Sequence, residues 1–454
     1  MLTALRPSSP GTAIVGLFFA IVLAVGALVP GALAPLLAIT AAFGLAILAG
    51  RHLTGCSVAW LLIAGTSLEM TMNDLVGPPA FGITIAAVKG TQLGVAALCI
   101  MRYGPRLDPF NPAWAFGAIF AVGLVHGLYP GLTPADSLRS LAGSTIPFAF
   151  CFARVPRDWA SAMIRATRWA PLISVAGGAV LYAANLRPLF VESGGARLAG
   201  LGHPAFLGGI CLAAIYAGLI RLYRDGARGD LVLLGVNFVL LVLTGARAPM
   251  AYAVMVTGLT FAFVSAPGMP TRRRWLLLVG AATLLLLLVM MNHALADIRL
   301  FNILSTRSTD LSGRDLLWPP FEQAASQSYW FGWGLGAGNF IIPPDSEVAQ
   351  LVQTWAAHNE YLRMEVEGGQ LGRGLLIIAF VLWVVHNTRG LPRAERQIMR
   401  LVFIAFAAHA ATDNVLISTP ASVLFTFVAA VFSGSSLGNI TARRSRLPKV
   451  EAVA

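Results

Sequence analysis

The sequence predicts an all-α fold, a polytopic transmembrane helical bundle of about 12–14 spans with one large external loop. Three observations predict it. Hydrophobic residues make up 57% of the 454 residues and charged residues only 11%, and the mean hydropathy is +0.74. Long apolar runs follow one another along the chain, and arginines gather in alternate segments between them. A soluble domain of this length is far less apolar.

The spans are expected where windows of about 19 residues are apolar enough to cross roughly 30 Å of hydrocarbon. The candidates in the N-terminal part cover residues 12–29, 33–49, 56–69, 80–101, 112–129, 135–153, 170–185, 204–220, 230–244, 248–265 and 275–291. The C-terminal candidates cover residues 371–387, 397–412 and 415–437. The short runs are the least certain spans.

Arginines give the orientation, because cytoplasmic segments carry an excess of basic residues. If the N-terminus is cytoplasmic, every second segment is basic, including the C-terminal tail, so both termini are predicted on the cytoplasmic side. This pattern accounts for the formal net charge of +12 without nucleic acid as a partner. It leaves a few external arginines unexplained: Arg187, Arg197, Arg247, Arg299, Arg307 and Arg314.

The N-terminal run and the cysteines call for no special role. Residues 12–29 have the length of a secretory signal, but a second apolar run starts at Leu33, so an uncleaved first hairpin is expected. The four cysteines lie in or beside apolar runs and form no CxxC pair, so we interpret them as small packing residues.

The chain divides into an N-terminal part of the bundle (1–291), a large external loop (292–370) and C-terminal helices with a basic tail (371–454). Within the loop, residues Leu311–Ser328 are expected to be partly helical despite Pro319 and Pro320, and Gly332–Pro344 irregular. A helix is expected over Thr354–Glu367, with Leu362, Met364 and Val366 available for packing.

Three cations inside or beside the spans stand out. Arg247 lies in a tight turn between two spans, where the free N–H groups of the following helix would add to an anion site; it is equally an arginine that snorkels at a helix end. Arg139 and Lys89 lie within predicted spans, at a cost of roughly 2.5–3.5 kcal/mol each near the bilayer centre. Such residues usually face a cavity or a partner, and Glu69 is a possible ion-pair partner for Lys89.

His358 is the candidate base. It is the histidine of the external loop proper, and an imidazole can take a proton from a sugar hydroxyl at neutral pH. Glu365, seven residues later, would lie on the same helical face and orient the ring. A hydrogen-bonded surface histidine is the simpler interpretation of this residue taken alone.

Two other patterns carry little weight. The glycine-rich stretch 332–338 follows no strand and resembles a nucleotide loop only in its glycine count. His358-Asn359-Glu360 is not an HExxH motif and has no second histidine at i+4, so we expect no metal site and no cofactor.

Four stretches together resemble the bacterial O-antigen ligase and polysaccharide polymerase superfamily, integral membrane glycosyltransferases. Arg197-Leu198-Ala199-Gly200 before His203-Pro204 resembles the family's Arg-x-x-Gly and Asn/His-Pro segments, and Leu243–Arg247 its Leu-Thr-Gly-x-Arg turn. Ser312-Gly313-Arg314 with Trp318, then 332–336, is similar to the start of its large periplasmic loop. His358-Asn359, followed by Gly369 and Gly372, fits its histidine signature. The likeness covers about residues 190–375, and His203-Pro204-Ala205 departs from the Asn-Pro-Asn common in the family.

The resemblance implies a bacterial inner-membrane enzyme that transfers a glycan from undecaprenyl diphosphate to an acceptor hydroxyl at the periplasmic face, without a metal and with inversion. Carried over by position, His358 would be the base, and Arg197, Arg247 and Arg314 would bind the donor, with Arg139 and Lys89 as further candidate binding residues. The expected partners are the undecaprenyl-diphosphate-linked oligosaccharide, a glycan or lipid A core acceptor, and membrane lipids.

Several alternatives stay open. The acceptor would be the lipid A core in a ligase, another lipid-linked repeat unit in a polymerase, or a Ser, Thr or Tyr side chain in a protein glycosyltransferase, and Leu311–Arg314 with Trp318 slightly favours a polymerase. A transporter or flippase of lipid-linked glycans would also use many spans and cavity charges such as Lys89 and Glu69. It would not need a long external loop with a histidine.

Overall fold

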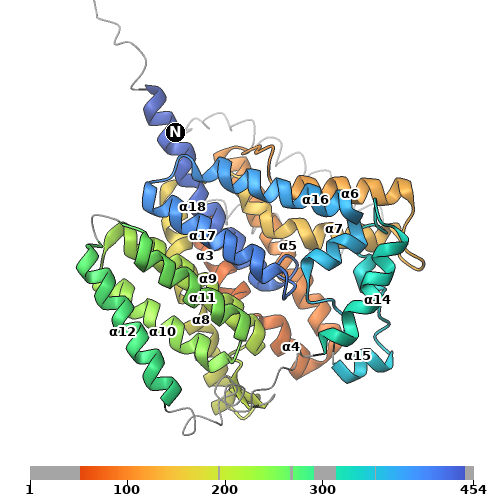
Figure 1. Cartoon of the computed structure of the whole chain (residues 1–454), viewed down its shortest axis with the longest axis horizontal. Helices are drawn as coiled ribbons and strands as arrows, with labels where there is room; N and C mark the ends of the chain where they lie inside the picture. The colour runs from red at the N-terminus through yellow and green to blue at the C-terminus, as the bar shows by residue number, and fades with distance from the viewer. Residues whose placement is uncertain (1–51, 193–194, 266–268, 291–312, 353, 445–454) are drawn as a thin grey trace, which may run out of the picture. The chain divides into compact units, whose positions relative to one another are not determined.

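The computed structural model describes residues 52–192, 195–265, 269–290, 313–352 and 354–444. The chain forms two compact units, Met1–Cys56 and Ser57–Ala454, and the second carries every feature discussed below (Figure 1). The first two predicted spans, the two chain ends, His293, Arg299 and Arg307 lie outside the described residues. The three-part division of the chain and the cytoplasmic position of both termini stay predictions.

The described part of the chain is mostly helical, as predicted, and the predicted spans from residue 56 onward overlap helices. Two of them are divided: 56–69 between α3 and α4, and 135–153 between α7 and η1. The first helices are α3 (Leu53–Ala64), α4 (Leu68–Val76), α5 (Pro78–Tyr103), α6 (Ala113–His126), α7 (Pro134–Thr145) with the 3-10 helix η1 (Ile146–Phe152), and α8 (Arg157–Ala183). The middle helices are α9 (Pro204–Asp225), α10 (Arg228–Thr244), α11 (Arg247–Phe263) and α12 (Thr271–Met290). The last are α14 (Arg314–Gln327), η2 (Ala337–Asn339), α15 (Glu347–Val352), α16 (Glu360–Thr388), α17 (Arg393–Ala410) and α18 (Thr419–Arg444).

Three of the described helices, α5, α9 and α16, are long and apolar enough to cross a membrane. Helices α3 and α4 meet the same test together but are bent by 53° at the break between them. These long apolar helices make the chain a polytopic helical membrane protein, and the count of about 12–14 spans remains a prediction from the sequence.

Helix α9 is the centre of the bundle. It packs against α8, α10, α11, α17 and α18, and most of its side chains are buried. Small residues allow this close approach: a Cβ added at Gly208 would lie 2.6 Å from the Cβ of Ala246, and one at Gly218 would lie 3.1 Å from Leu234. Because Ala246 belongs to the turn before α11, the same contact fixes the position of Arg247.

Aromatic rings join η1 to the three C-terminal helices. Phe148 of η1 lies 4.2 Å, centroid to centroid, from Phe425 of α18, and Trp383 of α16 contacts Phe403 of α17 and Phe432 of α18. Such pairs contribute about 0.5–1.5 kcal/mol each beyond their buried area. They hold α16, α17 and α18 together, and these helices flank the segments that carry the site.

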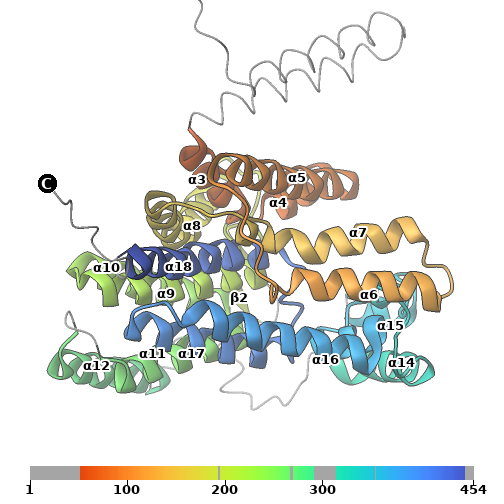
Figure 2. The ribbon, with the colours of Figure 1, turned by 90° about the horizontal axis from the view of Figure 1, so that it is seen from above.

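The described part of the large loop folds around a core of its own. Leu317, Phe321, Ile342 and Val366 are buried there with Leu132, which precedes α7, and Figures 1 and 2 show α14 and α15 beside the start of α16. The expected helix over Leu311–Ser328 is confirmed as α14. The expected helix start at Thr354 is wrong, because α16 begins only at Glu360, after the cap residue Asn359.

Helix α16 contains a break at Gly369 that explains the glycines of the loop. Gly369 adopts φ 62° and ψ −168°, and the N–H groups of Gln370 and Leu371 bond to the carbonyls of Tyr329 and Trp330. The carbonyls of Val366 and Glu367 in turn accept from the N–H groups of Trp333 and Gly334. The stretch 329–334 therefore takes over the hydrogen bonds that the broken helix turn releases.

One element departs from the all-α expectation. Phe190–Glu192 (β1) and Ala196–Leu198 (β2) form a small antiparallel hairpin, in which Val191 pairs with Arg197. Runs of three residues carry too little periodicity to be recognised in a sequence. The hairpin matters because β2 positions Arg197.

Candidate functional site

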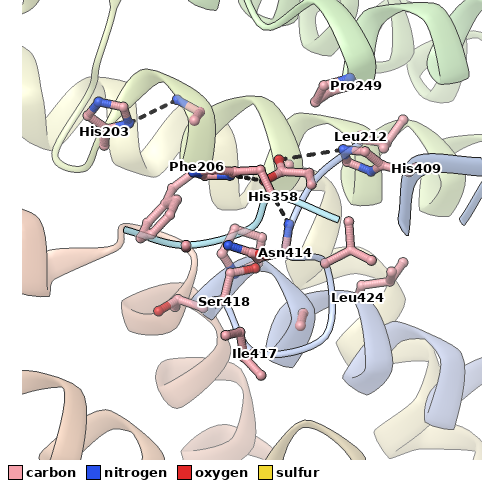
Figure 3. A pocket seen from close by; sticks show the side chains of 18 of the residues that line it. His203, Phe206, Leu212, Pro249, His358, His409, Asn414, Ile417, Ser418 and Leu424 are labelled. Carbon is pink, nitrogen blue, oxygen red and sulfur yellow. Dashed lines mark hydrogen bonds and ion pairs between the residues drawn. The ribbon is translucent and has the colours of Figure 1, made fainter. Parts of the chain in front are cut away.

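A cavity of about 760 Å³ lies where α4, α5, α9, α18 and the large loop meet. Its polar wall contains Arg197, His203, Arg314, His358, His409 and Asp413. Its apolar wall contains Met70, Phe81, Ile85, Phe206, Leu212 and Leu424. Figure 3 shows His358 and His409 facing this cavity together with Asn414 and Ser418. The volume lies in the range of ligand-binding cavities, roughly 300–1,000 Å³.

His358 occupies a distinctive backbone position. Its φ is 46°, in the left-handed region that non-glycine residues visit rarely, although histidine does so more often than most. Asn359 follows it as the N-cap of α16, and its side chain accepts from the N–H groups of Tyr361 and Leu362. A non-glycine residue held in this region often marks a functional site. The cap therefore starts the helix directly after His358.

Asp413 is the partner of His358. The Nδ1 atom of His358 lies 3.2 Å from Oδ1 of Asp413, and its Nε2 atom lies 3.2 Å from the hydroxyl of Thr354. Asp413 accepts from Nδ1–H, so Nε2 keeps its lone pair and can accept a proton. The prediction that Glu365 orients the ring is wrong: Glu365 pairs with Arg373 on α16, and His358 precedes the helix on which the two were expected to share a face.

Asp413 also lies beside His409 and is held in its charged form. Its second oxygen is 3.7 Å from Nε2 of His409. Burial acts to raise the pKa of Asp413, but the hydrogen bonds and charges of His358 and His409 outweigh it and hold the pKa well below its usual range. The carboxylate is therefore ionised near neutral pH and can stabilise a positive charge on His358.

A buried ion cluster fixes both sides of this pair. Arg363 lies between Glu360 and Glu367 with N–O distances of 2.6 and 3.0 Å, and all three side chains are buried. The other oxygen of Glu360 accepts from the N–H of Leu416, 2.9 Å away. Leu416 lies in the segment between α17 and α18 that also carries Asp413. Glu360 thus joins the helix start next to His358 to the segment that presents its partner.

Two of the predicted donor-binding arginines line the cavity. Arg197 donates from Nε to the carbonyl of Thr244 at 2.9 Å, and Arg314 donates to the carbonyl of Thr412 at 2.6 Å. Burial lowers the pKa of Arg314, opposed by Asp413 and reinforced by Arg247; a guanidinium nevertheless remains charged near neutral pH.

Arg247 is the first residue of α11 and lies near enough to Arg314 to act on its charge. The helix start carries no side-chain cap. The third residue of this helix is Pro249, which has no N–H, and the N–H of Met250 bonds to the carbonyl of Ala246. The anion site expected at this helix start stays a prediction.

Of the remaining predicted cations, Lys89 lines the cavity and Arg139 does not. Lys89 lines the cavity from α5. Glu69 accepts from the hydroxyl of Thr419, and the described residues show no ion pair between Lys89 and Glu69. Arg139 lies elsewhere: its side chain is 83% exposed and pairs with Asp136 on α7, so it does not line the cavity. Arg187 bonds to Asp74 and to the carbonyls of Gly200 and Gly202, which makes it a structural link to the segment before α9.

His203 lines the same cavity as the cap of α9, and its Nδ1 accepts from the N–H of Ala205 at 3.3 Å. Burial, reinforced by Arg197 and Arg187, lowers the pKa of His203 to about 4. The ring is therefore neutral near pH 7 and serves as a helix cap.

Three residues that line the cavity were not predicted from the sequence: Asp413, His409 and Trp355. Asp413 is an acid in a turn of a few residues between two apolar runs on the predicted external side, so the test that singled out the external arginines could have found it. The indole of Trp355 is 45% exposed and lines the cavity near His358. In the described part of the chain, no group of three His, Cys, Asp or Glu side chains is arranged to hold a metal ion.

The cavity thus combines an oriented histidine, an ionised partner, fixed cations and an apolar wall. Residues 231–377, which include Arg247, Arg314 and His358, match the family model described as O-antigen ligase. The match covers less than half of the chain, and over these residues the protein is similar to O-antigen ligases. None of the curated proteins matches the chain.

The matched residues cover most of α10, then α11, α12, α14 and α15, and the first part of α16. Arg197, Lys89 and Asp413 lie outside the matched residues but line the same cavity as His358. The family described by the model is one of enzymes, and the matched residues contribute Arg314 and His358 to the polar wall of the cavity.

Proposed function

We propose that the protein transfers a glycan from undecaprenyl diphosphate to an acceptor hydroxyl, with His358 as the base. The observation that supports this most directly is the single cavity that brings His358 together with Arg197, Arg314 and Lys89. A family of O-antigen ligases implies lipid-linked glycans as substrates in general, and the residues of this cavity supply the chemistry that such a substrate needs.

The proposed reaction begins at Nε2 of His358. The acceptor hydroxyl donates its proton to Nε2 while its oxygen attacks the anomeric carbon of the donor sugar, from the face opposite the diphosphate. The bond between the anomeric carbon and the diphosphate oxygen breaks, so the configuration inverts. Asp413 stabilises the imidazolium until the proton passes to water. The hydroxyl of Thr354, 3.2 Å from Nε2, occupies the direction from which the acceptor hydroxyl would approach.

The arginines stabilise the leaving group. A diphosphate leaves with an added negative charge and needs no proton if fixed cations are already in place. Arg197 and Arg314 each donate to a backbone carbonyl, which helps to fix the guanidinium beside the cavity, and the fork of a guanidinium matches the geometry of phosphate oxygens. Arg247 and the uncapped start of α11 extend the same electropositive region.

The apolar wall suits the lipid part of the donor. Phe81 and Ile85 of α5 line the cavity on the same helix as Lys89, and α5 is a predicted span with many exposed apolar side chains. A polyprenyl chain would leave the cavity along this helix, with Lys89 near its phosphate end. Trp355 offers a flat apolar surface for a pyranose ring near the base.

A transporter or flippase would use the same cations but would have no use for an oriented histidine. The His358–Asp413 pair in the cavity therefore favours the transferase. The acceptor distinguishes a polymerase, a ligase and a protein glycosyltransferase, and the preference for a polymerase rests on Gly313-Arg314 and Trp318 at the start of α14.

The test uses purified protein, a defined undecaprenyl-diphosphate oligosaccharide and either lipid A core or no second acceptor. A ladder from donor alone identifies a polymerase, and a single product with the core identifies a ligase. His358→Gln is expected to reduce turnover at least 100-fold, since general base catalysis contributes about 10²–10⁴-fold.

The matched control is His126→Gln, because His126 lies at the end of α6 against Phe331 and does not line the cavity. It should retain normal turnover. Near-normal transfer by folded His358→Gln would refute the assignment of the base. Donor movement across vesicles without transfer to any acceptor would favour a transporter.

A further inference from the structure

A second cavity, of about 560 Å³, runs between α16 and α17. Its walls are Leu376, Ile377, Phe380, Val381, Val384 and Val385 from α16, and Phe403, Ile404, Phe406, Ala407 and Ala410 from α17. Phe406 also borders the first cavity, but His358, Asp413 and Arg314 do not line the second. One end of the groove reaches Glu360 and Leu416 beside the site proposed for transfer, and its apolar part between α16 and α17 lies apart from the polar wall of the first cavity.

The groove has the dimensions of a lipid chain. Its lining on α16 starts at Glu360, and its continuous apolar part extends from Leu376 to Val385, about 14 Å at 1.5 Å per residue. One leaflet of a bilayer contributes roughly 15 Å of hydrocarbon. Ile377, Val381 and Ile404 on its walls are 42%, 56% and 61% exposed, so the groove opens toward the surroundings of the bundle and can take a chain from the side.

One end of the groove is basic. Arg393, Arg396 and Arg400 are spaced three and four residues apart on α17 and so share one face of the helix. The same face continues into the groove through Phe403, Ile404 and Ala407. Glu395, an acid in the same part of α17, is already paired with Arg224 at 2.6 Å. These three arginines lie in the segment predicted to be cytoplasmic, where anionic lipid headgroups concentrate.

Arg400 links the basic face to the apolar walls. Its Nε donates to the hydroxyl of Thr388 at 3.3 Å, which directs the guanidinium to the groove end, and its Nη groups are available to a phosphate. We propose that this groove binds one anionic diacyl phospholipid from the cytoplasmic leaflet, with an acyl chain between α16 and α17 and the phosphate on Arg400. The bound lipid would brace the two helices that lead to His358 and Asp413.

The test is native mass spectrometry of the full-length protein released from detergent micelles containing phosphatidylglycerol or phosphatidylcholine with identical chains. The wild type should retain one phosphatidylglycerol in preference to phosphatidylcholine. Arg400→Gln should reduce that preference about fivefold, because a cation near an anionic lipid surface contributes about 1 kcal/mol. Ala407→Phe, which fills the groove, should reduce retention of both lipids.

The matched control is Arg165→Gln, because Arg165 is an exposed arginine of another predicted cytoplasmic segment, at α8, outside the groove. It should leave the preference unchanged. Equal losses in Arg400→Gln and Arg165→Gln would overturn the proposal in favour of a diffuse charge effect. Displacement of phosphatidylglycerol by equimolar undecaprenyl phosphate would overturn it in favour of a polyprenyl site.

Discussion

Replacing Asp413 by asparagine tests whether the carboxylate orients and charges the proposed base. Asparagine keeps the size of the side chain and removes the negative charge, and its amide can present either an oxygen or an NH₂ group to Nδ1 of His358. We expect folded protein with strongly reduced turnover and a nearly unchanged KM for the donor, because Asp413 acts on the imidazolium that forms during transfer.

The geometry sets the size of the effect. At the observed 3.2 Å, a unit charge pair is worth about 1.3 kcal/mol in water and about 5 kcal/mol at an effective dielectric constant of 20. These limits correspond to about tenfold and a few thousandfold in rate. Because the His358 and Asp413 side chains are 34% and 39% exposed, solvent screens the pair, and we expect a loss of about 100-fold in kcat.

The assay is the transfer reaction described above, measured from pH 5 to 9. Asp136→Asn is the matched control: Asp136 is also about one-third exposed and ion-paired, but with Arg139 outside the cavity. Asp413→Asn should move the acidic limb of the pH–rate profile to lower pH, because the imidazolium loses its stabilising charge. Asp413→Glu should recover part of the rate.

A folded Asp413→Asn protein that turns over at the wild-type rate would refute the proposed role of Asp413. A rise in donor KM with unchanged kcat would also refute it, and would assign Asp413 to positioning Arg314 instead, since Arg314 bonds to the carbonyl of the preceding Thr412. A uniform loss of rate at every pH would indicate a purely structural role.

Two further predictions concern the frame of the site. Gly369→Ala should destabilise the protein by about 1–3 kcal/mol or more, because the added Cβ would lie 2.3 Å from the Trp330 carbonyl carbon. The control is Gly374→Ala in the same helix, where an added Cβ meets nothing within 4 Å. Equal melting temperatures of the two variants in detergent would contradict the expected destabilisation. The wild type should lose stability as the pH falls from 6.5 to about 4, because the folded ring of His203 has a pKa of about 4 and the unfolded chain binds a proton that the folded chain does not. His203→Asn should not show this loss. The ring is packed among protein atoms on one side but borders the open cavity on the other, so solvent limits the effect to about 1 kcal/mol at pH 5. Parallel melting temperatures of wild type and His203→Asn across that window would show that His203 is not held neutral.

The sequence was sufficient for the helices and for half of the polar wall. Apolar windows gave the spans because a bilayer demands long apolar runs, and arginines on the external side stood out against the topology. It was not sufficient for contacts that join distant segments. Asp413 lies 55 residues after His358, and no periodicity connects the two. The break at Gly369 was equally hidden, since its lost helical bonds are replaced by a loop about 40 residues earlier.

The stretch His358-Asn359-Glu360 therefore combines three tasks in consecutive residues. His358 presents the ring from a left-handed backbone position, Asn359 starts the helix immediately after it, and Glu360 holds the segment that carries Asp413 through the N–H of Leu416. Glu360 can bind Leu416 with one oxygen only because Arg363 neutralises the other in a buried cluster with Glu367. Removing one member of such a cluster leaves an uncompensated buried charge, at a cost of about 3–5 kcal/mol. The orientation of the proposed base and the stability of the helix that follows it thus depend on the same few residues.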